Sequence, residues 1–237
     1  MGRFAETVFG RKVLPRNCLV FGGVYVSRRA QVVRKRFDSW TRPRGNWIKY
    51  TYAKRGSRLY LVCFNVYGGA TTLELLNLLR DGNVESVFFL GSMGSETLEI
   101  GQVVLPYEVD DRAGIVAIDS PHHPVVEVDA ESIDSIERVL KDSGISFVKG
   151  KTASVPAVLH SIKSIKDYIS RRKDILGVEL ELSTFHHFGR KLGLRTYGLL
   201  YVWDNPKHDI LSGPLEVWRT RMRTLDLITQ TALAVLG

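Results

Sequence analysis

The feature that most constrains the fold is the alternation of short apolar runs with helix-like segments. The runs NCLVFGG (17–23), RLYLVCFNV (58–66) and ESVFFLG (85–91) have the apolar character of strands covered on both faces. The segments ATTLELLNLLRD (70–81) and DAESIDSIERVLKDSG (129–144) place Leu or Ile at helical spacing, and a glycine ends each one. Strands that alternate with helices favour a three-layer α/β/α fold with a largely parallel or mixed sheet.

The remaining segments continue this alternation. WIKYTYA (47–53) and the run at 58–66 flank Gly56, a pattern typical of a hairpin. Further strands are predicted at GQVVLPYEV (101–109), GIVAI (114–118), SFVKGKTA (146–153), DILGVEL (174–180) and RTYGLLYVW (195–203). Further helices are predicted at 29–37, 156–172, 183–193 and 214–236.

Length and composition set the outer bounds. The 237 residues are 44% hydrophobic and 24% charged, and we find neither a linker-like nor a low-complexity stretch, so we predict one domain over residues 1–237. No apolar run approaches the roughly 20 residues that cross a bilayer, and the N-terminus lacks a signal-like stretch. We therefore expect a cytoplasmic protein without a membrane partner. Cys18 and Cys63 lie in apolar runs and are expected to be small buried hydrophobes.

The net charge of +8 is concentrated near the N-terminus. Residues 1–58 contain 15 Lys and Arg but only Glu6 and Asp38 as acids, a balance of +13. Trp40, Trp47, Tyr50 and Tyr52 are interleaved with these charges, a pattern that would suit nucleic-acid stacking. A solvated basic face, or one that meets an acidic patch of another subunit, is the interpretation that we favour. Nucleic acid is thus the less favoured partner.

Polar and glycine residues follow several of the predicted strands. Ligands of open α/β sheets bind beyond the carboxyl ends of the strands. The residues at those ends are Gly22, Gly23, Tyr67, Gly68, Gly69, Gly91, Ser92, Glu179, Glu181 and Asp204. From the residues alone, each has an ordinary alternative: a tight turn at Gly68–Gly69, a first-turn helix residue at Glu181 and a turn residue at Asp204.

Adjacent histidines do not indicate a metal site. His122-His123 and His186-His187 are consecutive pairs, and consecutive side chains on a helix diverge by about 100°. No further Cys or His set completes a tetrahedral site, so we expect no metal.

The order of these segments resembles the nucleoside phosphorylase superfamily, which contains purine nucleoside and uridine phosphorylases and several nucleosidases. NVYGGATTLELLNLL is similar to the family's glycine turn and helix, and FFLGSMG to its glycine-serine loop. GVELE resembles Val-Glu-Met-Glu, and VWDNP resembles the Val-Ser-Asp ending. The resemblance implies a three-layer α/β/α subunit with a mixed, partly barrel-like central sheet. It also implies a homo-oligomer, with a hexamer favoured.

The resemblance carries roles onto individual residues. It implies Asp204 as the acid at the base, and Glu181 with Leu180 and Glu179 at the ribose. The implied phosphate group is Gly23, Arg28 or Arg29, Gly68, Gly69 and Ser92, and the implied base contacts are Val155, Pro156 and Val178. It implies no cofactor, with inorganic phosphate as co-substrate and a nucleoside or nucleotide as substrate.

Several departures from the family keep the reaction open. Phe89 stands where phosphorylases place an arginine, Gln102 replaces an aspartate, and the aromatic residue that stacks on the base is missing. The glutamate that activates water in the hydrolases is also absent after the first strand. From the resemblance as a whole, we predict phosphorolysis of the N-glycosidic bond of a nucleoside. Hydrolysis of a nucleoside or of a nucleotide such as AMP, and a catalytically reduced nucleotide- or nucleic-acid-binding module, are the alternatives.

Overall fold

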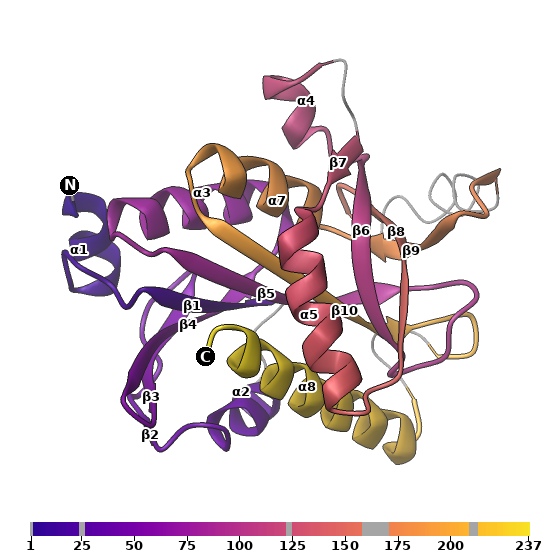
Figure 1. Cartoon of the computed structure of the whole chain (residues 1–237), viewed down its shortest axis with the longest axis horizontal. Helices are drawn as coiled ribbons and strands as arrows, with labels where there is room; N and C mark the ends of the chain where they lie inside the picture. Colours follow the sequence, from indigo (N-terminus) through magenta and orange to yellow (C-terminus); the bar gives the residue numbers. More distant parts are fainter. Residues whose placement is uncertain (1, 24–26, 122–124, 158–170, 209–212) are drawn as a thin grey trace.

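The computed structural model describes residues 2–23, 27–121, 125–157, 171–208 and 213–237 (Figure 1). The helix predicted at 156–172 and the pair His122-His123 lie largely or wholly outside these residues. Within the described ranges, no helix combines the length and the apolar character that crossing a bilayer requires.

The strands form one mixed sheet whose central part closes into a barrel. The order of neighbouring strands is β10-β6-β8-β9-β5-β1-β4-β3-β2, and β10 also pairs with β5, which closes the five strands β10, β6, β8, β9 and β5 on themselves. The strands are β1 Asn17–Gly22, β2 Ser39–Trp40, β3 Lys49–Arg55, β4 Arg58–Val66, β5 Ser86–Gly94, β6 Val103–Asp111, β7 Val125–Glu127, β8 Phe147–Ser154, β9 Ile175–Glu179 and β10 Arg195–Asp204. The predicted α/β fold with a barrel-like sheet is confirmed.

The helices form two layers on opposite sides of this sheet (Figure 1). One layer contains α1 Arg3–Phe9, α3 Gly68–Asp81, α4 Ile115–Asp119 and α7 Leu182–Lys191. The other contains α2 Ser27–Arg34, α5 Ala130–Asp142 and α8 Leu215–Val235. In the first layer α3 packs along α7, so the N-termini of these two helices can meet above the strand ends.

One predicted strand is a helix. GIVAI forms α4 because Gly114, at φ 78°, turns the chain, and because the Asp111 carboxylate accepts a hydrogen bond from the Val116 N–H at 3.0 Å. A short apolar run alone does not distinguish a strand from a buried helical turn. The short elements α1, β2 and β7 had no pattern long enough to predict them.

The basic N-terminal segment lies at the β2–β3 edge of the sheet and on α1 and α2. Its interleaved aromatic residues do not form an open stacking surface, because Tyr50 is buried and Trp40 and Tyr52 are half-buried. Only Trp47 among the four is exposed, at 46%. The two cysteines are buried and free, as expected.

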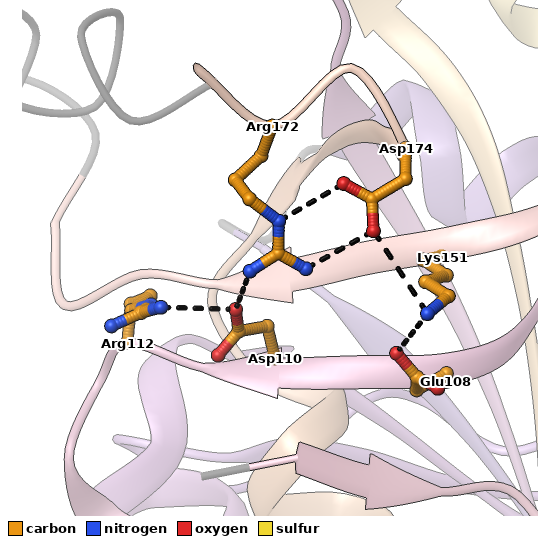
Figure 2. A network of polar contacts seen from close by, with 6 residues as sticks. All are labelled: Glu108, Asp110, Arg112, Lys151, Arg172 and Asp174. Carbon is orange, nitrogen blue, oxygen red and sulfur yellow. Dashed lines mark hydrogen bonds and ion pairs between the residues drawn. The ribbon is translucent and has the colours of Figure 1, made fainter. Parts of the chain in front are cut away.

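A network of charged side chains ties β6, β8 and the start of β9 together (Figure 2). Arg112 and Arg172 both contact one oxygen of the buried Asp110 carboxylate, at 3.2 and 3.3 Å, and Arg172 also pairs with Asp174. Lys151 bridges Glu108 and Asp174. Because successive side chains of a strand point to opposite faces, Asp110 faces this network while Asp111 faces α7.

Phe89 fills the core at the centre of β5. Its side chain is fully buried and its ring lies 5.3 Å from that of Phe185 on α7. Gly22 and Gly91 leave room for it, since a Cβ at either position would come within 2.5–2.6 Å of the ring. The position where the resembling family carries an arginine is therefore dry and apolar here.

We predict that Phe89→Arg unfolds or strongly destabilises the protein. A buried charge without a partner costs several kcal/mol, so we expect a loss of more than about 3 kcal/mol in the free energy of unfolding. The matched variant Phe89→Leu should lose only about 1–2 kcal/mol. Urea denaturation of both variants measures the difference. An arginine variant as stable as the wild type would mean that solvent or a polar pocket reaches this position.

Candidate active site

Two buried glutamates lie where the predicted site was expected, and each one caps a helix. Glu179, at the end of β9, accepts hydrogen bonds from the backbone N–H groups of Glu181 and Leu182, both at 2.7 Å. The Ser154 hydroxyl donates to its other oxygen. Glu179 thus binds the N-terminus of α7, where the helix dipole favours a negative charge.

Glu181 reaches across to the neighbouring helix. Its Oε1 accepts a hydrogen bond from the N–H of Gly68, the first residue of α3, at 2.7 Å. Gly68 adopts φ +80°, which favours glycine, and Gly69 allows α3 to approach Thr184 of α7. The anion bound by this turn is therefore the protein's own carboxylate. The Gly68 N–H is thereby engaged within the protein, and the phosphate role of the Gly68–Gly69 amides stays a prediction.

Burial strongly affects the protonation of this pair. Only 3% of Glu179 and 4% of Glu181 is exposed. Burial raises the pKa of Glu179 to about 7, and burial together with the neighbouring Glu179 charge raises that of Glu181 to about 8. Glu179 receives three hydrogen bonds that favour its ionised form, whereas Glu181 receives one from Gly68 and a longer one, 3.3 Å, from Leu180. Glu181 is therefore the carboxyl of the pair whose protonated form is the more favoured.

A row of polar side chains in register supports Glu179. Asp111, Ser154 and Glu179 are direct neighbours across β6, β8 and β9. Asp111 accepts a hydrogen bond from the Ser183 hydroxyl at 2.8 Å, and the Ser183 N–H donates to Ser154 Oγ at 2.9 Å. Asp111, Ser154 and Ser183 were not among the residues predicted for the site. Their position at the carboxyl ends of predicted strands or at a helix start was the available signal.

A small pocket, lined mostly by apolar side chains but with a few polar groups, lies at the ends of β1 and β5. Gly23, Arg29 and Ser92 line it, together with Asn65, which adopts φ 64° where β4 shifts register against β1. Arg29 Nε is buried and has no hydrogen-bond partner among the described residues. Arg28 is exposed and does not line the pocket, so the structure places Arg29, and not Arg28, beside Ser92.

Asp204 ends β10 next to the tip of β5. In the register, Gly94 of β5 pairs with Asp204 on one side and with Val178 of β9 on the other. A Cβ on Gly94 would lie 2.8 Å from Asp204 Oδ2, so the glycine makes room for the carboxylate. The strand tips thereby bring Asp204, Val178 and the adjacent Glu179 to one end of the barrel.

The other predicted residues are less informative. Leu180 and Val155 are buried, and the Val155 N–H bonds to the Glu179 carbonyl at 2.8 Å, so Val155 continues the β8 edge. Pro156 is exposed. His186 bonds to Thr196 and His187 to Asp119, and no group of three potential metal ligands occurs within the described residues.

Comparison with solved structures finds the same fold in several enzymes of low sequence identity. Uridine phosphorylase from Vibrio fischeri ES114 is 18% identical, with a TM-score of 0.78 over 94% of this chain and 91% of that one. The 5′-methylthioadenosine/S-adenosylhomocysteine nucleosidase of Campylobacter jejuni is 13% identical, with a TM-score of 0.74 over 93% and 98% of the two chains. A futalosine hydrolase mutant from Helicobacter pylori is 12% identical, with a TM-score of 0.72 over 93% and 98%.

Comparison with curated protein sequences finds no match. The sequence profile of the phosphorylase superfamily, in contrast, matches residues 47–234, which include β4, the α3 turn, Ser92, the two buried glutamates and Asp204. The match covers most of the chain, and the chain therefore belongs to the phosphorylase superfamily.

Proposed function

We propose that this protein cleaves the N-glycosidic bond of a nucleoside by phosphorolysis, as a pentosyltransferase. The observation that carries the proposal is the convergence of Glu181, Asp204 and the Arg29–Ser92 pocket at neighbouring strand tips. These groups suit a sugar diol, a departing base and an oxyanion, respectively. Membership of the superfamily and structural likeness to both a phosphorylase and nucleosidases support the same class of reaction.

The chemistry assigns one role to each group. Glu181, once ionised, accepts hydrogen bonds from the two ribose hydroxyls. Asp204 supplies or shares a proton with the base as the C1′–N bond breaks. A phosphate oxygen, with Arg29, Ser92 and Gly23 as the donors proposed to hold the ion, then forms the new C1′–O bond. The products are the free base and ribose 1-phosphate.

Hydrolysis is the second candidate, and Phe89 favours it. The ring excludes a guanidinium from the strand position where the resembling phosphorylases place one. Water would then replace phosphate as nucleophile, and free ribose or ribose 5-phosphate would be the sugar product. A protein that binds nucleosides or nucleotides without releasing base would instead be a catalytically reduced binding module on the same fold.

We further propose that the enzyme is a homo-oligomer, with a hexamer favoured. Large apolar side chains are exposed on the single subunit, among them Phe4 at 70%, Ile118 at 81% and Leu215 at 64%. Contiguous patches of such side chains commonly mark interfaces, and the family resemblance adds the expectation of an assembly. Light scattering measures the mass, and a monomer at every salt concentration would contradict the proposal.

We predict that Arg29→Ala raises the phosphate concentration for half-maximal base release by about 10- to 100-fold. One hydrogen-bonded charge contributes about 1.5–3 kcal/mol, and each 1.4 kcal/mol is a factor of ten. The matched control is Arg28→Ala, which removes an exposed charge from the neighbouring position and should change this concentration less than about twofold. Ribose 1-phosphate formation against phosphate concentration is the measurement. Free ribose produced at a rate indifferent to phosphate would leave hydrolysis as the reaction.

The raised pKa of Glu181 predicts a pH-dependent stability. The folded protein keeps a proton that the unfolded chain releases above about pH 4.3. The unfolded state therefore binds fewer protons in this range, and the free energy of unfolding falls as the pH rises from about 4.3 toward 8. Urea denaturation between pH 5 and 8 should show this decline, and Glu181→Gln should make it shallower. The exposed control Glu74→Gln should leave the slope unchanged, and equal slopes in all three proteins would contradict the prediction.

A further inference from the structure

Arg29 is held in the pocket by an aromatic ring. Its Cζ lies 3.8 Å from the centroid of the Trp203 ring, well inside the range of a cation–π contact. No ion pair between Arg29 and a carboxylate occurs among the described residues, and its Nε has no hydrogen-bond partner there. The guanidinium therefore keeps its charge and its donors for a ligand while the ring fixes its place.

Trp203 is itself fixed from several sides. It is 4% exposed, and its carbonyl accepts a hydrogen bond from Arg221 Nε at 2.7 Å. The Arg221 guanidinium lies 4.7 Å from the ring centroid, and Trp218 of α8 meets the ring edge-on at 5.5 Å. A side chain held in this way is a rigid platform for the longer and more flexible Arg29.

The backbone around Trp203 explains the direction of its side chain. Val202 pairs with Met93 and Asp204 with Gly94, so two steps on β10 match one step on β5 and Trp203 is the additional residue. Such a bulge changes the direction of a side chain and is common beside active sites. The end of β10 thus carries Asp204 and, one residue earlier, Trp203, whose ring contacts Arg29.

We infer that Trp203 is a positioning residue that holds Arg29 for an inorganic phosphate ion and so sets the affinity of this pocket. The inference deepens the proposed function, on which it rests. Trp203 stands where the resembling family has serine, and Phe89 stands where it has arginine. The two departures are linked: the arginine lost from β5 is replaced by Arg29, and Trp203 is what keeps the replacement in place. The pocket has a free volume of only about 10 Å³, so phosphate must open it, and Arg29 is the lining side chain with the most rotatable bonds.

The test is calorimetric titration of inorganic phosphate into the full-length protein and its variants. A cation–π contact contributes about 0.5–2 kcal/mol, so Trp203→Leu should raise the dissociation constant about 3- to 30-fold, and Trp203→Phe less. The matched control Trp218→Phe touches the same ring but not Arg29 and should leave the constant within about twofold. The double variant Arg29→Ala/Trp203→Leu should bind no more weakly than Arg29→Ala alone, because Trp203 acts through Arg29.

Three outcomes would overturn the inference. They are additive losses in the double variant, an unchanged constant in a folded Trp203→Leu protein, and no phosphate binding by the wild type at millimolar concentration. Melting temperatures identify variants that fail to fold. If Trp203→Leu does not fold, Trp203→Phe, which keeps a ring, replaces it, and an unchanged dissociation constant in that variant would overturn the inference. Phosphate-dependent base release is assayed in parallel. Phosphate binding that depends on Trp203 without any base release would refute the proposed function and leave the positioning role intact.

Discussion

The capping of two helices by two buried glutamates is the constraint on which the site depends. Glu179 binds the N-terminus of α7 and Glu181 binds that of α3. Because α3 follows β4 and α7 follows β9, these contacts hold the ends of the two strands and the starts of the two helices together. Burying two adjacent carboxylates is costly, and the helix amides and the retained proton offset that cost. The arrangement leaves Glu181 less satisfied than Glu179, and a ligand with two hydroxyl groups would complete its hydrogen bonds.

A second feature is the position of the positive charge in the pocket. Phe89 turns the centre of β5 into apolar core that packs on Phe185, which strengthens the contact between the sheet and α7. The positive charge of the pocket then comes from α2, whose Arg29 leans on Trp203 at the end of β10. In the proposed site, core packing and anion binding are thereby divided between separate residues.

Much of the fold was predictable because it depends on local pattern. The apolar runs form β1, β4 and β5, and the segment with leucines at helical spacing forms α3. These elements were predictable because the periodicity of apolar residues is a signal that extends over only a few residues. The row Asp111–Ser154–Glu179 was not predictable, because it depends on the register of strands far apart in sequence. The choice between Arg28 and Arg29 required the orientation of α2, and the role of Gly68 required knowledge that Glu181 would reach it. For GIVAI, a capping contact from Asp111 outweighed the strand-like composition.

The measurement that most directly tests this account compares ribonucleosides with their 2′-deoxy counterparts as ligands of the wild type and of Glu181→Gln. If Glu181 accepts hydrogen bonds from the sugar hydroxyls, the substitution should weaken ribonucleoside binding by about 10- to 100-fold at a pH above about 8, where Glu181 is ionised, since a hydrogen bond to a charged group contributes about 1.5–3 kcal/mol. Binding of 2′-deoxyribonucleosides should fall much less, because they lack one of the two donors. Equal losses for both sugars would show that Glu181 only caps α3, and would remove the ribose from the site proposed here.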